Sequence, residues 1–215
     1  MPEKASQDMK ENYKEVIILG TSPTRRECPF DCETWGVNGV YTMEPINKAE
    51  GKPFRLDKLF TTDVTFSPEG NLHFDIDEMH RIKRKYKTEY ISMNPIGFGK
   101  RQLVSTPYPW KEITEYFKSD YFTSSVCHMV AYALYYNYTK IRIYGIDMAS
   151  KYEYLTQKGG VEYWLGRAVE RGVGIEICGG SALLKPSTGT PYGIKQKLDM
   201  KVIDPYGLMD KRTER

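Results

Sequence analysis

The chain has 215 residues, of which 40% are hydrophobic and 27% are charged, and its net charge at pH 7 is +3. This balance is typical of a globular protein, and a chain of this length buries roughly 70% of its unfolded surface without disulfide or metal staples. No segment approaches the roughly 18 consecutive apolar residues of a membrane-spanning helix, and the polar start contains no signal-peptide core, so we expect no membrane association. The small net charge does not argue for nucleic acid as a ligand, but it leaves a nucleic-acid acceptor open.

The four cysteines indicate a reducing compartment. Cys28 and Cys32 are four residues apart, but no second close pair follows them, so a zinc site has little support. Cys127 and Cys178 lie in apolar runs, where small core residues are expected. We therefore expect a cytoplasmic protein.

The sequence predicts one folded domain with two flanking segments. Residues 1–14 are expected to form a mobile arm, 15–184 a Rossmann-like nucleotide-binding domain, and 185–215 a C-terminal extension. The extension and the tyrosine-rich surface are candidates for contacts in a homo-oligomer. Unbroken aliphatic runs predict strands that are covered on both faces, as in a parallel sheet. In chain order, the predicted strands are 16–19, 34–37, 59–62, 90–93, 141–144 and 175–178.

Helical spacing predicts helices between these strands, and Thr123 and Ser124 can cap one of them. In chain order, the predicted helices are 77–86, 110–117, 123–134 and 161–171. Residues 42–57 give no clear prediction, and 94–109 and 148–158 are expected to be loops. Short connections between alternating strands and helices favour right-handed crossovers. The predicted fold class is therefore α/β: a Rossmann-like three-layer domain with a mainly parallel sheet.

Two candidate binding segments follow the first two strands, because ligands of an open parallel sheet bind outside the carboxyl ends of its strands. The turn of Gly20, Thr21, Ser22 and Pro23 offers hydroxyls and backbone N–H groups to an anion. It is neither a GxGxxG fingerprint nor a P-loop, and a structural turn explains it about as well. Asn38 can contact a base edge or a ribose hydroxyl, and an ordinary Asn-Gly turn is the equal alternative.

Two further candidate segments follow later in the chain. Thr123 and Ser124 open a helix and can contact a phosphate or ribose, although capping alone would explain them. Gly145 and Asp147 belong to a Gly-Ile-Asp block at a strand end, where a carboxylate would hold a ribose or a metal. The loop after it carries groups suited to a general base, a hydroxyl donor or charge stabilisation, and a solvated loop is the equal alternative. These candidate catalytic residues are Glu153, Tyr154 and Tyr152.

The histidines and the basic cluster favour structural roles. His73 and His80 lie in a polar region without a partner, which favours the surface. His128 lies within two turns of a helix start, and packing in the helix is favoured over ligand contact. The basic run within 81–87 is typical of a solvated helix face, with an acidic partner as the alternative.

Together these segments resemble a known family. The blocks VIILGTSPT…WGVNGVY, FTSSVCHMVAYALYYNYTKIRIYGIDM and IEICGGSALL resemble the bacterial CMP-sialic-acid-dependent sialyltransferases with a single Rossmann domain. The chain is also similar to archaeal-type 6-hydroxymethylpterin diphosphokinases and to small uncharacterised Rossmann-like proteins of tailed phages. The resemblance spans most of residues 15–184 and implies a nucleotide site.

Individual positions carry the resemblance to the sialyltransferases. Gly20, Ser22 and Pro23 align with that family's Gly-Asn-Gly-Pro-Ser turn, in which Thr21 replaces the asparagine. Asn38 stands where the family places a nucleotide-contacting asparagine. The remaining matches are the Thr-Ser helix start at Thr123 and Ser124 and the Gly-Ile-Asp block of Gly145, Ile146 and Asp147.

The chain also departs from the family. Those sialyltransferases use a histidine in the lid after Gly-Ile-Asp as general base, whereas this chain has no histidine beyond His128. The lid at 148–158 is also shorter. The resemblance therefore supports the fold and a nucleotide site more strongly than sialyl transfer.

Three functional hypotheses follow. The leading one is glycosyl transfer from a nucleotide-activated donor, a CMP- or UDP-linked sugar. It needs no obligatory metal, because no Asp-x-Asp metal motif stands in a suitable place. The second is magnesium-dependent diphosphoryl transfer, with Asp63 and Asp147 as metal ligands. The third is a binding protein, encoded by a phage, that keeps the nucleotide pocket without its chemistry.

Overall fold

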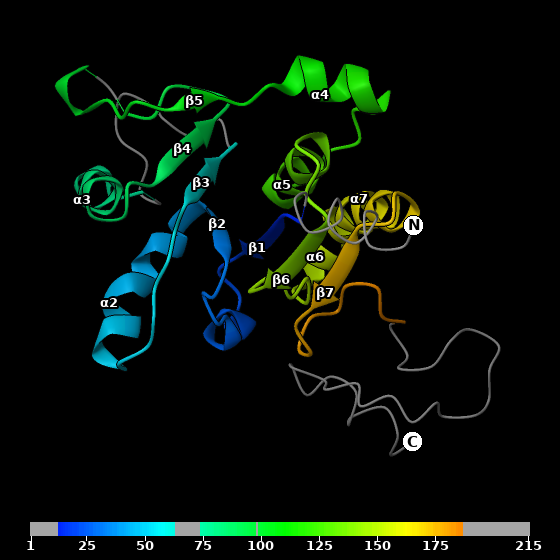
Figure 1. Ribbon diagram of the computed structural model, residues 1–215, viewed down its shortest axis with the longest axis horizontal. Coiled ribbons are helices and arrows are strands. Elements are labelled where there is room, and N and C mark those ends of the chain that lie inside the picture. The colour runs from blue at the N-terminus through cyan, green and yellow to red at the C-terminus, as the bar shows by residue number, and fades with distance from the viewer. Residues whose placement is uncertain (1–12, 63–73, 98, 187–215) are drawn as a thin grey trace, which may run out of the picture.

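The computed structural model describes residues 13–62, 74–97 and 99–186 (Figure 1). Within them, seven strands form one sheet in the order β5-β4-β3-β2-β1-β6-β7, and every pair of neighbouring strands is parallel. The strands are β1 (Glu15–Leu19), β2 (Glu33–Val37), β3 (Lys58–Thr61), β4 (Glu89–Ser92), β5 (Thr106–Pro107), β6 (Lys140–Tyr144) and β7 (Gly174–Ile177). The predicted arm lies almost wholly outside the described residues, as does most of the predicted C-terminal extension.

Helices cover both faces of the sheet. The α-helices are α2 (Met43–Ala49), α3 (Ile76–Tyr86), α4 (Trp110–Phe117), α5 (Ser125–Tyr135), α6 (Lys151–Thr156) and α7 (Lys158–Glu170). The short 3-10 helices are η1 (Pro23–Glu27), η2 (Asn38–Thr42) and η3 (Gly99–Arg101). Helices α4, α5 and α7 lie on one side of the sheet, and α2 and α3 lie on the other (Figure 1). No helix of the described residues is long and apolar enough to cross a membrane.

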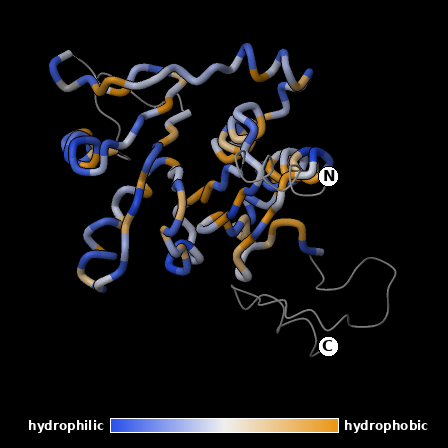
Figure 2. The backbone as a smooth tube through the Cα atoms, viewed as in Figure 1, coloured by the Kyte–Doolittle hydropathy of each residue, from blue (hydrophilic) through white to orange (hydrophobic). Residues whose placement is uncertain are grey.

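Alternating side chains of β1 divide the core into two layers. Val16 and Ile18 pack in the cluster that holds the buried faces of α4, α5 and α7. Ile17 and Leu19 pack in the cluster that holds Met79 of α3. All four β1 residues are fully buried, and hydrophobic segments run through the sheet in Figure 2. The predicted three-layer α/β fold is confirmed. It could be predicted because a strand that is buried on both faces has an unbroken run of apolar residues.

The strand order reverses next to β1. The chain runs outward from β1 through β2, β3 and β4 to β5, and then returns to place β6 on the other side of β1. The connection that follows β1 and the connection that follows β6 therefore run toward opposite edges of the sheet. This reversal opens a crevice at the carboxyl ends of β1 and β6, which is where ligands of such sheets bind.

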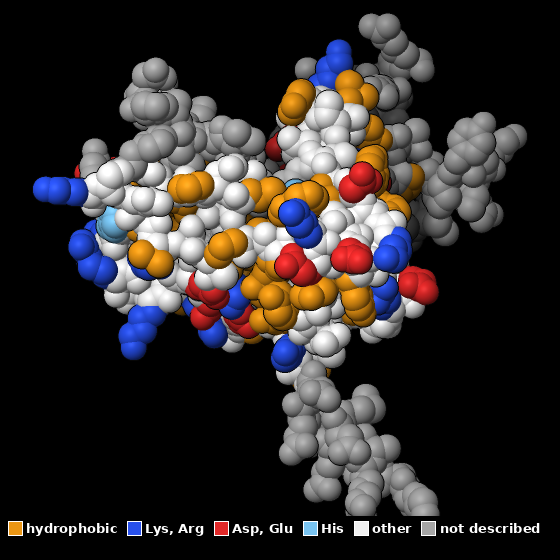
Figure 3. All heavy atoms as spheres, turned by 90° about the horizontal axis from the view of Figure 1, so that it is seen from above, with side chains coloured by type: hydrophobic (Ala, Val, Ile, Leu, Met, Phe, Trp, Pro, Cys, Tyr) orange, Lys and Arg blue, Asp and Glu red, His pale blue; other side chains and the backbone are white. Residues whose placement is uncertain are grey.

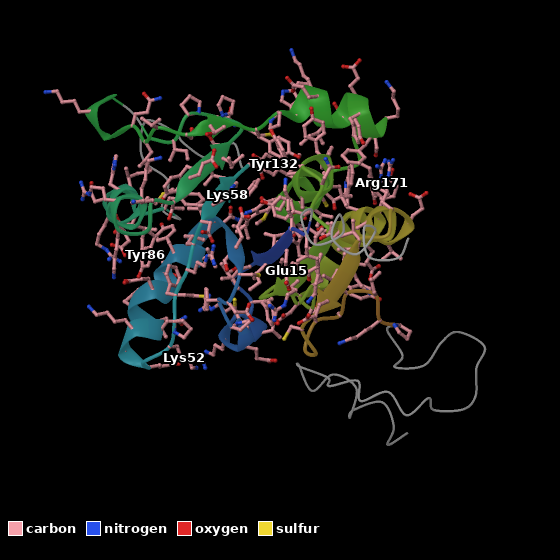
Figure 4. All side chains as sticks on the ribbon, in the orientation of Figure 1. Glu15, Lys52, Lys58, Tyr86, Tyr132 and Arg171 are labelled. Atoms are coloured by element: carbon pink, nitrogen blue, oxygen red, sulfur yellow. The ribbon has the colours of Figure 1, made fainter. Side chains whose placement is uncertain are left out.

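Ion pairs cross the opposite, amino edge of the sheet. Glu15 of β1 lies 2.9 Å from Lys140 of β6, and Lys58 of β3 lies 3.0 Å from Glu33 and 3.6 Å from Glu89 (Figure 4 labels Glu15 and Lys58). Each such partly exposed pair contributes about 0–1 kcal/mol. A slipped strand would lose these pairs, so they favour the observed register.

Two residues of the basic run of helix α3 pair with a buried carboxylate. Arg81 donates to the Glu44 carboxylate of α2 at 2.8 Å, and Lys85 pairs with the same carboxylate. Glu44 is only 4% exposed, and hydrogen bonds from Lys85 and Arg81 lower its pKa to about 2. These two ion pairs therefore join α2 to α3. On the face seen in Figure 3, acidic and basic side chains lie next to one another.

One helix lies where the sequence gives no clear prediction, and another lies where a loop is predicted. Helix α2 lies within 42–57, where Met43 and Asn47 are buried one turn apart although the segment is polar overall. Helix α6 lies within the predicted loop 148–158, so that loop prediction was wrong. Ser150 and Glu153 form a capping box at its start, and this reciprocal pair of hydrogen bonds stabilises a helix that buries none of its residues.

Helix α7 begins at Lys158, three residues before its predicted start. Gly159 and Gly160, which precede the predicted helix, lie inside α7. A Cβ at Gly160 would lie 2.1 Å from the Thr123 hydroxyl oxygen. The glycine therefore allows α7 to approach the segment before α5 closely.

Candidate functional site

A cleft of about 380 Å³ opens at the carboxyl ends of β1, β2 and β6. It lies at the point where the strand order reverses, and residues from six segments of the chain line it. They are Gly20, Thr21, Ser22, Val37, Asn38, Thr123, Ser124, Ser125, Val126, Gly145, Ile146, Asp147, Met148, Tyr152, Glu153 and Gln157.

Two glycines let the ends of β1 and β6 touch. A Cβ at Gly20 would lie 2.2 Å from the Gly145 carbonyl oxygen, and a Cβ at Gly145 would lie 2.5 Å from that of Gly20. Gly145 also has a left-handed φ of +65°. The Ser22 N–H donates to the Gly145 carbonyl at 2.9 Å. The loop after β1 is therefore fixed against the loop after β6, and its backbone forms one wall of the cleft.

Asp147 anchors this wall from within the protein. It is 1% exposed, and its carboxylate accepts hydrogen bonds from the hydroxyl of Thr24 and, at 3.3 Å, from the Thr24 N–H. The Thr24 hydroxyl in turn accepts from the Gly145 N–H at 2.9 Å. Asp147 was predicted to hold a base, a ribose or a metal. Its carboxylate holds the 20–24 turn in place, and the residue also lines the cleft, so its role toward a ligand stays a prediction.

Asn38 faces the cleft from the end of β2. Its φ is +53°, a left-handed conformation that asparagine tolerates better than most residues. Its side-chain oxygen Oδ1 is buried and has no hydrogen-bond partner within the described residues. A buried carboxamide oxygen without a donor costs stability, so a ligand that supplies an N–H or O–H would be favoured here.

The amino-terminal end of α5 also faces the cleft. Its N-cap residue Ser124 makes no side-chain capping bond, and the Ser124 hydroxyl lies 3.5 Å from the Cys127 sulfur. Ser125 and Val126, the first two residues of the helix, line the cleft. The first N–H groups of a helix have no acceptor within it, and the helix dipole is positive at this end. This end of α5 is therefore suited to an anion.

Thr123 has a structural partner. Its hydroxyl donates to the Gln157 carbonyl at 2.9 Å, where α6 meets α7. It was predicted to contact phosphate or ribose, and it lines the cleft. The bond leaves the hydroxyl oxygen free to accept from a ligand but commits its proton to the protein.

Helix α6 forms the outer rim. Tyr152 is 68% exposed and lines the cleft. The Glu153 carboxylate accepts from the Ser150 N–H at 3.3 Å as part of the capping box. Tyr154 is not among the residues that line the cleft, and its ring centroid lies 4.5 Å from the Lys158 amine. Of the three predicted catalytic residues, the structure therefore places two at the cleft.

The structure brings most of the predicted site residues together. Of the predicted nucleotide-binding residues, only Pro23 does not line the cleft, because it begins η1. Prediction missed Val126 and Gln157, together with the apolar Val37 and Met148. Val126 follows the Thr-Ser-Ser segment directly, so the helix start could have indicated it. Gln157 follows the last residue of α6, and because this helix was not predicted, the position of Gln157 at the cleft could not be predicted either.

The cleft is polar, and its described lining residues carry no basic side chain. They include the carboxylates of Asp147 and Glu153 and no lysine, arginine or histidine. Among the described lining residues, the groups suited to an anion are backbone N–H groups and hydroxyls. A group with one negative charge fits such a site better than one with several.

His128 packs away from the cleft, as its helical position predicted. Its ring stacks on Phe122, with ring centroids 4.2 Å apart, and lies edge-on to Tyr108. Its Nδ1 is buried without a hydrogen-bond partner among the described residues. Burial lowers the pKa of His128 to about 4. The ring is therefore neutral at physiological pH and belongs to the core.

The described residues contain no group of three His, Cys, Asp or Glu side chains that could hold a metal ion. The magnesium hypothesis named Asp63, which lies outside the described residues, and Asp147, whose carboxylate holds Thr24. His73 also lies outside the described residues. Diphosphoryl transfer therefore stays a prediction without an observation in its favour.

No protein-family model matches the chain, and no curated protein matches its sequence. Among solved structures, the sialyltransferase CstII from Campylobacter jejuni with cytidine-5'-monophosphate is similar at 17% identity and a TM-score of 0.46, over 76% of this chain and 79% of that one. The same enzyme with CMP-3FNeuAc gives 16% identity and a TM-score of 0.46, over 88% and 92%. The apo α-2,3-sialyltransferase from Campylobacter jejuni gives 15% identity and a TM-score of 0.40, over 78% and 76%. Similarities this low assign no family, substrate or residue role to the chain.

Proposed function

We propose that the cleft binds the nucleotide of a nucleotide-activated sugar and that the chain transfers the sugar to an acceptor hydroxyl. One observation carries this proposal. The uncapped end of α5 and the unpaired carboxamide oxygen of Asn38 face the same cleft. The first is suited to a phosphate, and the second is suited to a hydrogen-bond donor on a base or ribose. A nucleotide has both groups.

The charge of the cleft favours a donor with one phosphate. The N–H groups of Ser125 and Val126 and the hydroxyl of Ser22 can hold a monoanion. Two phosphates would bring more negative charge close to Asp147 and Glu153, with no basic side chain among the described lining residues to offset it. A CMP-linked sugar therefore fits better than a UDP-linked sugar.

The acceptor would enter beside α6. In the transfer step, the acceptor oxygen bonds to the anomeric carbon as the bond from that carbon to the phosphate oxygen breaks. The hydroxyl proton passes to the carboxylate of Glu153, and the nucleoside monophosphate leaves. Tyr152 can donate to the departing phosphate from the same helix. Glu153 must loosen its bond to Ser150 to act as the base, and that exposed hydrogen bond contributes little.

The test is a thermal-shift titration with CMP, UMP, UDP and the corresponding nucleotide sugars, with and without magnesium. A ligand at about 100 times its Kd stabilises the fold by about 2.7 kcal/mol. Asn38→Gly removes the carboxamide and tolerates the left-handed backbone, so it should abolish most of the shift. Asn137→Gly is the matched control, because Asn137 also has a left-handed φ, of +60°, and lies before the amino end of β6. No shift with any nucleotide in the native chain would contradict the proposal.

A second candidate function is nucleotide binding without turnover. It is favoured because both carboxylates that line the cleft are already bonded within the protein, Asp147 to Thr24 and Glu153 to Ser150. The two functions differ in donor hydrolysis and transfer, which phosphorus NMR follows directly. Release of nucleoside monophosphate that Glu153→Gln abolishes supports the transferase. Tight binding with an unchanged donor spectrum supports the binding protein.

A further inference from the structure

A second cavity lies on the same edge of the sheet as the cleft. It measures about 620 Å³ and is formed by the ends of β4 and β5 and the segment between them. Because β3, β4 and β5 are parallel, their carboxyl ends lie on the edge where β1 and β2 also end. This cavity lies outside the candidate nucleotide site.

The walls of this cavity are tied to the protein core. Ile96 and Leu103 pair as an antiparallel bridge, and both side chains are buried. At the base, the hydroxyl of Ser92 donates to that of Ser105 at 2.7 Å. On the rim, the Lys83 amine of α3 donates to the Val104 carbonyl at 2.8 Å. These contacts hold the cavity open as a formed feature of the fold.

Uncharged polar groups and apolar surfaces line the cavity. The polar lining residues described are Ser92, Asn94, Gln102 and Ser105, which carry hydroxyls and carboxamides, and no charged side chain lies among them. The carboxamides of Asn94 and Gln102 make no hydrogen bond to any described residue. Beside them, Val104 is 78% exposed, and the prolines and Met93 add further apolar surface.

This mixture matches a neutral carbohydrate. A carboxamide has donors and acceptors side by side, as a pair of sugar hydroxyls requires. The apolar side chains can pack against the C–H faces of a sugar ring. The Lys83 amine on the rim already donates to the Val104 carbonyl and no described lining residue is charged, so an anionic ligand is disfavoured. A purely apolar ligand would leave the two carboxamides unpaired.

The cavity lies within reach of the cleft. Neighbouring strands are about 4.8 Å apart, so the end of β4 is about 10 Å from the end of β2, where Asn38 faces the cleft. The end of β3 lies between them, and there the Thr62 hydroxyl donates to the Ser125 hydroxyl at 2.7 Å. A short chain of sugar units is long enough to span this distance.

We infer that this cavity binds the inner units of a neutral oligosaccharide acceptor whose terminal hydroxyl reaches the cleft. The acceptor role rests on the proposed glycosyl transfer. The binding of a carbohydrate in the cavity rests on its own lining residues. The acceptor class is accordingly an uncharged oligosaccharide, not a monosaccharide or a charged small molecule.

The experiment measures binding of maltotetraose, cellotetraose, chitotetraose and lacto-N-tetraose to the full chain by saturation-transfer NMR and calorimetry. We expect at least one to bind, and the double variant Asn94→Ala with Gln102→Ala to weaken it roughly tenfold or more, since two hydrogen-bonding side chains are lost. Asn137→Gly is the matched control: it removes an exposed carboxamide before the amino end of β6, on the opposite edge of the sheet from both sites, and should leave the oligosaccharide affinity unchanged.

The nucleotide thermal shift is measured on the same variants, so the two proposals fail separately. Oligosaccharide binding that the double variant weakens, with its nucleotide shift unchanged, supports the cavity. The same weakening in a chain that binds no nucleotide supports the carbohydrate site and contradicts the proposed transfer. If none of the four oligosaccharides binds, or if the double variant binds as tightly as the native chain, the inference is overturned.

Discussion

The hydroxyl of Thr24 lies between the carboxylate of Asp147, to which it donates, and the N–H of Gly145, from which it accepts. Thr24 and Asp147 are 123 residues apart in the chain, and both are almost fully buried. This pair joins the turn after β1 to the turn after β6. Through it, the core fixes the loop that forms one wall of the cleft.

Thr24→Val removes the hydroxyl and keeps the shape of the side chain. Asp147 would then keep the weaker bond from the residue 24 N–H and lose its hydroxyl donor, while the Gly145 N–H would lose its acceptor. We expect unfolding in urea to show a loss of about 2–3 kcal/mol, because a buried charged group is left under-bonded. Thr24→Ser keeps the hydroxyl and should lose less than half as much. Equal stability of the valine variant and the native chain would show that the pair does not support the turn.

Gly20→Ala tests the close contact between the ends of β1 and β6. The new Cβ would lie 2.2 Å from the Gly145 carbonyl oxygen, so the backbone must shift. We expect a loss of about 1–3 kcal/mol and weaker nucleotide binding, because overpacking moves one wall of the cleft. Gly39→Ala is the control, since nothing lies within 4 Å of a Cβ there and its φ is −78°. A Gly20→Ala variant as stable as this control would contradict the contact.

More of the fold than of the candidate site could be predicted from the sequence. Residues 16–19 form an unbroken aliphatic run, which has few interpretations other than a strand buried on both faces. In a parallel sheet the carboxyl ends of all strands share one edge, so the turn at Gly20, the Asn38 position and the Gly145 block were expected to converge. They line one cleft.

What local pattern could not predict depends on contacts between distant segments. The sequence places Asp147 at a strand end, where a free carboxylate would be a ligand, but its partner Thr24 is found only in the folded chain. Helix α6 buries no residue, so it has no hydrophobic period to reveal it. Its one local signal was Ser150 with Glu153 three residues later, a capping-box pattern.

The buried His128 predicts acid sensitivity. Burial lowers its pKa in the folded state to about 4, against an ordinary value of 6.5. Above the ordinary value the ring is neutral in both states, and the stability is fully present. As pH falls below it, the unfolded chain takes up the proton and the folded chain does not, so the stability is progressively lost down to the folded-state pKa. Between about pH 7.5 and about pH 5, we expect a loss of about 2 kcal/mol from this group.

His128→Phe separates this loss from other titrations. Phenylalanine keeps the stack on Phe122 and cannot take up a proton. Urea unfolding of the variant should therefore be nearly independent of pH over the same range, before carboxylates such as Glu44 begin to titrate below their ordinary value of 4.5. An unchanged pH dependence in the variant would assign the sensitivity to another group.

Thr61→Val tests a buried hydroxyl at the end of β3. Thr61 is 2% exposed, and its hydroxyl oxygen has no hydrogen-bond partner within the described residues. Valine has nearly the same shape and favours strands as strongly, so replacing an unpaired hydroxyl with a methyl group should raise the stability by about 1 kcal/mol. Thr34→Val is the matched control, because Thr34 is equally buried on β2 but donates to the Cys32 carbonyl at 3.0 Å, and it should lose stability. A loss of stability in Thr61→Val that matches the control would mean that the Thr61 hydroxyl is paired in solution.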